Sequence, residues 1–156
     1  MGPITAEIKV FIEQQKLCFV ATVCPDGTPN LSPKGTTRVW DENHLVFGDI
    51  RSPGTVNNLL ANPAVEINMV DVFNRKGYRF KGVAKVVSSG PLFEKVIAFY
   101  GEMAEKYAMK NIVMVKVDRA LPLWSPAYDI GMSEEELVKM YRDYWFGMHG
   151  EAGISM

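Results

Sequence analysis

The sequence predicts a mainly β domain of the α+β class, an antiparallel β-barrel that is closed or nearly closed and carries peripheral helices. Three observations lead to this fold. Short segments rich in β-branched and aromatic residues recur along the chain, tight turns separate most of them, and helical patterns stand at both ends and at two places between strands. A chain of 156 residues suits one such domain.

The chain begins with a helical pattern in which Ile8, Phe11 and Ile12 share one face. A Pro-Asp-Gly turn at residues 25–27 then separates two strands. Pro33 has no N–H for a ladder hydrogen bond, so the second of these strands is expected at an edge or at a bulge. Six or so short strands are expected among the β-rich segments, which are residues 17–23, 29–34, 36–40, 45–49, 64–70, 78–87 and 112–117.

Four helices complete the prediction. Ser52 is a good N-cap and Pro53 suits the first helical position after it. Ser133 and Glu136 form a capping box for the last helix. The helices are expected at residues 5–15, 53–60, 91–108 and 134–145. A single domain is expected, divided into a core, a C-terminal loop with its helix, and a loosely ordered tail, at residues 17–117, 118–146 and 147–156.

Composition argues against several classes of protein. A net charge of −1 and a pI near 6.1 argue against nucleic-acid binding. No apolar run approaches the length of a bilayer span, and the first residues lack the organisation of a secretory signal, so no membrane partner is expected. Cys18 and Cys24 are interpreted as reduced, structural thiols of a cytoplasmic protein. Since His44 and His149 are the only histidines, no metal site is predicted.

The start of the second helix is suited to an anion. Free backbone N–H groups and the positive end of the helix dipole meet at a helix N-terminus. Arg51 adds a forked, permanently charged donor there, and Thr55 adds a hydroxyl. The alternative interpretation is an ordinary Ser-Pro start of a surface helix, with Arg51 in solvent. The local pattern leaves both interpretations open.

Further basic and aromatic residues favour an anion site. Lys34 and a strand face with Arg79 and Lys81 are expected near the same barrel edge. Aromatic side chains that would wall a flat ligand there are Trp40, Phe47, Tyr78 and Trp124. The sequence contains no hydrolase elbow, zincin motif or dinucleotide fingerprint, so it names no catalytic residue.

A set of short features occurs in one order within residues 17–117. These are the turn at residues 25–27, the Pro33-Lys34-Gly35 segment, the Arg51-Ser52 helix start with Thr55, and the Asn62-Pro63 stop. Together they resemble the flavin-binding split-barrel proteins related to pyridoxamine 5′-phosphate oxidase. The resemblance implies a six-stranded antiparallel Greek-key split β-barrel, and a homodimer that holds FMN at the subunit interface.

The resemblance also implies residues for the cofactor. Those implied at the flavin ring and ribityl chain are Ser32, Pro33, Lys34, Gly48, Asp49 and Ile50. Those implied at the phosphate are Arg51, Ser52 and Thr55. Those implied to approach from the partner subunit are Lys76, Gly77, Tyr78 and Arg79, and Trp124 resembles a late aromatic residue that closes the site.

The function that this reasoning favours is an FMN-dependent oxidoreductase acting on a small molecule. An FMN-holding electron carrier without its own substrate is the alternative, and an interaction domain without a cofactor is a third. The choice between FMN and a deazaflavin stays open. The chain lacks the C-terminal Arg-x-His signature of the oxidase, and Arg51-Ser52 carries one charge fewer than the usual basic pair. Pyridoxamine 5′-phosphate is therefore not the expected substrate.

Overall fold

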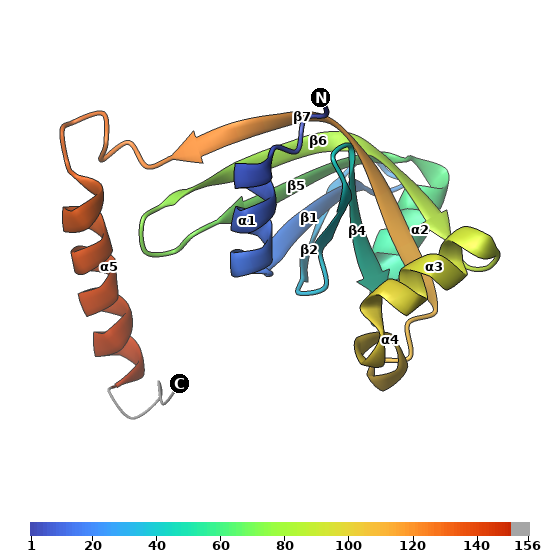
Figure 1. Ribbon diagram of the computed structural model, residues 1–156. Helices are drawn as coiled ribbons and strands as arrows, with labels where there is room; N and C mark the ends of the chain where they lie inside the picture. The colour runs from blue at the N-terminus through green and yellow to red at the C-terminus, as the bar shows by residue number, and fades with distance from the viewer. Residues whose placement is uncertain (151–156) are drawn as a thin grey trace.

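One antiparallel sheet of seven strands organises the protein, in the order β2-β1-β5-β6-β7-β4-β3 (Figure 1). The computed structural model describes residues 1–150. The strands are β1 (Cys18–Val23), β2 (Pro29–Lys34), β3 (Arg38–Asp41), β4 (His44–Asp49), β5 (Ala64–Val70), β6 (Lys76–Val87) and β7 (Asn111–Trp124). The helices are α1 (Ala6–Gln15), α2 (Pro53–Ala61), α3 (Pro91–Tyr100), α4 (Glu102–Lys106) and α5 (Glu134–His149). The mainly β, α+β prediction is confirmed.

The barrel differs from the expectation in two respects. It has seven strands instead of six, and no ladder joins its edge strands β2 and β3, so the sheet is not closed. Side chains tie the segment between these strands to the sheet. The Thr36 hydroxyl accepts a hydrogen bond from the Gly48 N–H at 3.0 Å, and the Tyr100 hydroxyl donates to the Thr36 carbonyl at 2.7 Å. As Pro33 predicts, β2 is an edge strand.

Two apolar clusters lie on opposite sides of the sheet. Inside the barrel, Ile8 and Ile12 of α1 pack with buried residues of β1, β4, β5, β6 and β7, among them Phe80. On the outer side of β4 and β7, Val96 and Tyr100 of α3 pack with Met109 and Met114. Alternation along the strands, with successive side chains on opposite faces, serves both clusters.

Cys18 lies in the inner cluster, and its thiol is 3.0 Å from the Thr37 hydroxyl. Burial raises the pKa of the Cys18 thiol to about 11, so the thiol stays protonated and inert at neutral pH. Cys24 is half-buried at the end of β1, and both cysteines are free. These findings agree with the interpretation of two reduced thiols.

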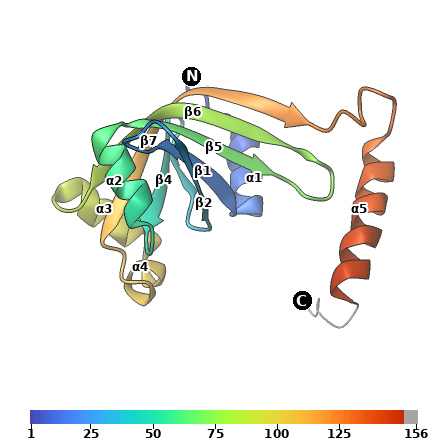
Figure 2. The ribbon, with the colours of Figure 1, turned by 180° about the vertical axis from the view of Figure 1, so that it is seen from behind.

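The expected loop after residue 117 is wrong, because β7 continues to Trp124 and pairs with the start of β6. Pro122 misled the sequence-based prediction, since proline donates no ladder hydrogen bond. In this stretch β7 pairs with β6 alone, because β4 pairs only with Asn111–Lys116. A strand edge tolerates proline. The start of β6 (residues 76–79) and the end of β7 (residues 121–124) thus form an arm that projects beyond the barrel (Figures 1 and 2).

Two helix predictions also need correction. The single helix expected at 91–108 is broken into α3 and α4 at Gly101, whose φ of 56° interrupts the helical backbone. The last helix, α5, runs to His149, past the boundary expected at residue 146, so His149 is helical and its ring stacks on Trp145 at a centroid distance of 5.8 Å. Of the expected tail, residues 151–156 lie outside the described residues.

No helix among residues 1–150 is long and apolar enough to cross a membrane. The position of α5 is unusual for a domain of this size. It follows the end of the arm in the chain and lies apart from α1 and the barrel in both views (Figures 1 and 2). The helix α5 therefore lies apart from the barrel of its own chain.

Candidate cofactor site

The first turn of α2 is open to a ligand. Ser52 occupies the N-cap position as predicted, but its side chain makes no capping hydrogen bond. The Lys34 ammonium group donates to the Ser52 hydroxyl at 2.5 Å and to the Ser32 hydroxyl at 2.7 Å instead. Pro53 at the first helical position has no N–H to satisfy. The positive end of α2 therefore meets a lysine and two hydroxyls at one point, which is a favourable place for an anion.

Lys34 is the electrostatic centre of this region. It is only 5% exposed, and burial lowers the pKa of its ammonium group while the nearby Asp49 opposes that effect. Asp49 is itself held in place, because its carboxylate accepts from the Ser52 N–H at 3.0 Å and from the Asn111 side-chain amide at 3.1 Å. A buried cation with a single carboxylate nearby is stabilised further by any anion that binds beside it.

These groups line a cleft of about 370 Å³, which we call the Lys34 cleft. Its walls come from the ends of β2 and β4 and the start of α2. The lining residues are Ser32, Pro33, Lys34, Gly35, Thr36, Gly48, Ile50, Arg51 and Ser52. Asp49 lies behind this wall, and Thr55 is buried in the first turn of α2 at 2% exposure and does not line the cleft. The structure thus gathers seven of the nine residues expected on this side.

Thr36 and Asn111 were missed by the sequence analysis. Thr36 lines the cleft and bridges to Gly48, and Asn111 fixes Asp49 from the start of β7. The Asn111–Asp49 contact joins residues 62 positions apart in the chain. Neither residue belongs to a recognisable motif, so only the pairing of β4 with β7 reveals the role of Asn111.

The second group of expected residues lies in a different place. Lys76, Gly77, Tyr78 and Trp124 line a cleft of about 590 Å³ between α1 and the arm, which we call the arm cleft. Its other walls include Phe11, Tyr128 and Glu134, which the sequence analysis did not assign to a site. Lys76 pairs with Glu134 and lies 4.8 Å from the centre of the Tyr128 ring. The volume is in the range of small-molecule sites.

Two residues of this second group have structural roles of their own. A Cβ at Gly77 would lie 2.1 Å from the Met69 carbonyl oxygen, so the close approach of β5 requires glycine there. Arg79 does not line the arm cleft; its Nε lies 3.0 Å from the Glu66 carboxylate, which also pairs with Lys81 at 3.0 Å. The basic strand face is therefore partly neutralised within the chain.

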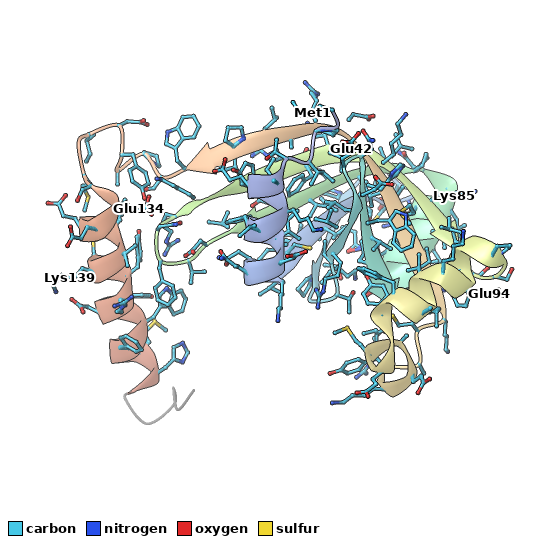
Figure 3. The ribbon with its side chains drawn as sticks, viewed as in Figure 1. Met1, Glu42, Lys85, Glu94, Glu134 and Lys139 are labelled. Carbon is cyan, nitrogen blue, oxygen red and sulfur yellow. The ribbon has the colours of Figure 1, made fainter. Side chains whose placement is uncertain are left out.

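The two clefts lie on different parts of the molecule. The Lys34 cleft is at the start of α2, whereas the arm cleft is on the arm, which projects away from α2 in both views (Figures 1 and 2). Figure 3 shows that Glu134, one wall of the arm cleft, lies at the α5 end of the arm. Most of the residues expected from one subunit thus line the Lys34 cleft, whereas Lys76, Gly77 and Tyr78, expected from its partner, line the separate arm cleft.

A comparison with protein families decides the relationship of the chain. Residues 4–122 match the family model for pyridoxamine 5′-phosphate oxidase. The chain belongs to the pyridoxamine 5′-phosphate oxidase family. No curated protein matches the chain in sequence.

Solved structures agree with this family. HupZ of Group A Streptococcus, in an epitope-tagged form, superposes with a TM-score of 0.70 at 32% identity, over 78% of this chain and 95% of that one. A protein of Lactobacillus delbrueckii, titled a putative pyridoxamine 5′-phosphate oxidase, gives 0.66 at 24% identity over 78% and 95%. An FMN-binding protein of Syntrophomonas wolfei gives 0.63 at 14% identity over 74% and 82%. The last two show the fold alone.

The donor set of the Lys34 cleft fits a phosphate-bearing cofactor. The cleft contains the buried Lys34 ammonium group, the exposed Arg51 guanidinium group and two serine hydroxyls. These groups lie at the N-terminus of α2, where the N-cap serine makes no capping hydrogen bond to the backbone. In contrast, no cluster of metal-ligating side chains is found in the described part of the chain. The family relationship and the chemistry of the cleft therefore point to the same class of ligand.

Proposed function

We propose that the protein binds FMN and acts as an oxidoreductase on a small molecule. The observation that carries the proposal is the Lys34 cleft, where Lys34, Arg51 and Ser52 converge on the N-terminus of α2. A phosphate monoester matches this set, because it accepts several charge-assisted hydrogen bonds and favours the positive end of a helix. The family match supports the proposal.

In this proposal Arg51, Ser52 and the first-turn N–H groups of α2 hold the phosphate. Lys34 is positioned by Ser32 and Ser52 so that its charge lies beside the ligand. Ser32, Pro33, Gly48 and Ile50 supply walls for the rest of the cofactor. Bound FMN would contribute the electron-transfer chemistry, and the protein would contribute binding, orientation and charge.

We further propose that the cofactor is shared between two copies of the chain. The arm cleft offers the aromatic walls Tyr78 and Trp124 and the cation Lys76, and it is remote from the Lys34 cleft of the same chain. A homodimer that brings the arm cleft of one copy to the Lys34 cleft of the other completes the site. The free thiols Cys18 and Cys24 support a cytoplasmic location for this dimer.

A second candidate function is an electron carrier that holds FMN without a substrate of its own. One observation favours it: apart from Lys34, whose ammonium group is already held by two hydroxyls, no residue that lines the Lys34 cleft has a carboxylate, imidazole, thiol or amine that could transfer a proton. General acid–base catalysis needs such a group within hydrogen-bond reach of the substrate. The two functions differ in whether the reduced cofactor passes electrons to a small molecule at the site or only to another protein.

The first test is the absorption spectrum of the purified protein, with mass spectrometry of the ligand released on denaturation. We expect a flavin spectrum and the mass of FMN. The mass of a deazaflavin cofactor would correct the identity of the cofactor, and a protein that neither carries nor binds any flavin would refute the proposal. Turnover with NADH or NADPH and small-molecule acceptors separates the enzyme from the carrier.

A matched pair of variants tests the site itself. Arg51→Ala removes one charge-assisted donor and should weaken FMN binding by about 10- to 100-fold. Arg119→Ala removes an exposed arginine of β7 and should leave the affinity unchanged. Isothermal titration of the flavin-free protein with FMN measures both. Equal affinities in the two variants would place the phosphate elsewhere.

A further inference from the structure

The helix α5 lies outside the part of the chain that defines the family. The family match ends at residue 122, and α5 spans Glu134–His149. The match to HupZ likewise covers 95% of that chain but 78% of this one. Properties of the family therefore do not explain α5, and its role has to be argued from its own contacts.

The N-terminal half of α5 is fixed to the arm and to the turn between β5 and β6 that precedes it. The Arg75 guanidinium lies 3.8 Å from the centre of the Tyr141 ring, Lys76 pairs with Glu134, and Leu137 is fully buried. The preceding loop is tied to the arm by Tyr128, whose hydroxyl donates to the Asn74 carbonyl at 2.5 Å. These contacts set the direction in which α5 leaves the arm.

From Met140 onward, α5 carries an apolar face that nothing in residues 1–150 covers. Met140, Tyr144 and Met148 are 44%, 53% and 58% exposed. Lys139 points away from the barrel (Figure 3). At 100° per residue, Tyr144 and Met148 fall on the opposite side of the helix, toward the barrel. There α5 stands apart from α1 (Figure 1).

A matching apolar patch lies on the outside of the barrel. Phe19 of β1 and Leu31 of the edge strand β2 are 45% and 65% exposed, and the register places them on one face as diagonal neighbours. Leu17, just before β1, is 53% exposed. Leu31 directly precedes Ser32, a wall of the Lys34 cleft. We call Leu17, Phe19 and Leu31 the β1–β2 patch.

We propose that α5 of one copy seats its Met140–Tyr144–Met148 face on the β1–β2 patch of a second copy. The same contact repeats in reverse across a two-fold axis, since each chain carries both surfaces. A helix of this length is marginal without tertiary packing, so its apolar face needs a partner that is always present. A second copy of the chain meets that need, whereas a transient partner protein does not.

The size of the contact is sufficient when the arm takes part. A helix of 16 residues is about 24 Å long and about 10 Å wide. The α5 face and the surface it covers on the partner copy, counted for both contacts of the two-fold dimer, together bury about 1,000 Å². Stable interfaces begin at about 1,200 Å². Val70, Val72 and Phe73 beside the arm are also exposed and supply further apolar surface. This contact rests on the homodimer proposed above but does not require bound flavin. Its failure would therefore leave phosphate binding at the Lys34 cleft, whose residues all belong to one chain, as a separate question.

The test compares two faces of α5 in the flavin-free protein. Tyr144→Glu together with Met148→Glu puts charges into the proposed contact, and Leu31→Glu does so on the barrel side. Phe146→Glu, on the face of α5 that shares the outward side of Lys139, is the matched control. Sedimentation equilibrium should show a dimer for the wild type and the control, and a dimer weakened at least about tenfold toward monomer in the other two. Circular dichroism checks that the barrel stays folded.

A charge rescue identifies the partner as a second copy. Leu31→Lys combined with Tyr144→Glu should recover a dimer that Tyr144→Glu alone weakens, because the opposite charges meet between copies. A wild type that is monomeric throughout, or a dimer that all the variants leave unchanged, would overturn the proposal. A dimer that the Glu variants weaken but the paired charges do not recover would also overturn the assigned contact.

Discussion

The barrel and the arm with α5 differ in how they use their apolar residues. The barrel buries them within the chain: Phe80 and Ile12 are almost fully covered, and α1 completes the inner cluster. The 16-residue helix α5 buries only Leu137 among its residues and leaves Met140, Tyr144, Phe146 and Met148 exposed. The barrel therefore buries its apolar residues within the chain, whereas α5 leaves several large apolar side chains exposed.

The same difference divides the candidate site. The Lys34 cleft is complete in its polar contacts, because Lys34, Ser52 and Asp49 are linked to one another within the barrel. The arm cleft has aromatic walls, with Phe11 of α1 facing Tyr78, and its cation Lys76 is already paired with Glu134. Under the proposed function, the groups that would bind the anion lie within one chain, while enclosure of the ligand would depend on a second copy.

The largest expected effect is on the free energy of unfolding, when one phenylalanine of the barrel and one of α5 are each replaced by alanine. Phe80→Ala leaves a cavity in the inner cluster and should lower the free energy of unfolding by about 3–5 kcal/mol. Phe146→Ala, on the outward side of α5, should change it by no more than about 0.5 kcal/mol. Urea denaturation measures both. Similar losses in the two variants would show that α5 is as well packed as the barrel.

A smaller effect is expected where the split of the barrel is held by side chains. The Tyr100 hydroxyl donates to the carbonyls of Thr36 and Val46 at 2.7 and 3.1 Å, and burial raises the pKa of this phenol, which keeps it protonated. Tyr100→Phe leaves the ring but removes the donor, and should cost about 1–3 kcal/mol. Tyr107→Phe, at an exposed tyrosine, is the matched control in the same denaturation experiment.

Local signals were enough to predict most elements of the barrel. The Pro-Asp-Gly turn, the alternation of 64–70 and the Ser133–Glu136 capping box each act over a few residues, and the structure has each of them. The arm was missed because Pro122 indicates a strand break unless its neighbours in the sheet are known. The break at Gly101 was missed because the apolar stripe of 91–108 continues across it.

The candidate site divides in the same way. The segments 32–34 and 48–52 could be predicted because each is short and chemically distinctive, and the structure brings them to one cleft. Thr36, Asn111 and Glu66 could not, since their roles come from contacts with residues of other strands that no local motif marks. Sequence reasoning therefore finds the donors of an anion site more readily than the residues that hold those donors.

A local effect is expected at the junction of the arm and α5. Arg75→Met keeps a long side chain but removes the cation from the face of Tyr141, an interaction worth about 0.5–2 kcal/mol. Hydrogen exchange should become faster in α5, by up to about tenfold, and stay unchanged in β5 and β6 of the barrel. Arg142→Met, at an exposed arginine of α5, should change neither. Faster exchange throughout the barrel would mean that the two regions unfold together.

The smallest effect concerns the charge of Lys34. Its pKa in the folded protein lies below the ordinary value of 10.5, because burial disfavours the ammonium form. Between these two pKa values the unfolded chain holds the proton more tightly than the folded protein. Unfolding therefore takes up a proton in that window, and stability rises with pH there; at lower pH the contribution is constant and unfavourable.

Lys34→Met should remove this rise, while the contributions of other lysines and tyrosines remain in both proteins. Urea denaturation of the flavin-free protein and the variant at several alkaline pH values measures the difference. Inorganic phosphate in the Lys34 cleft should stabilise the ammonium form and reduce the rise in the wild type. Phosphate that leaves the wild-type profile unchanged would contradict the assignment of Lys34 to an anion site. It would also remove the main contrast between a barrel that binds the anion alone and an arm that needs a second copy.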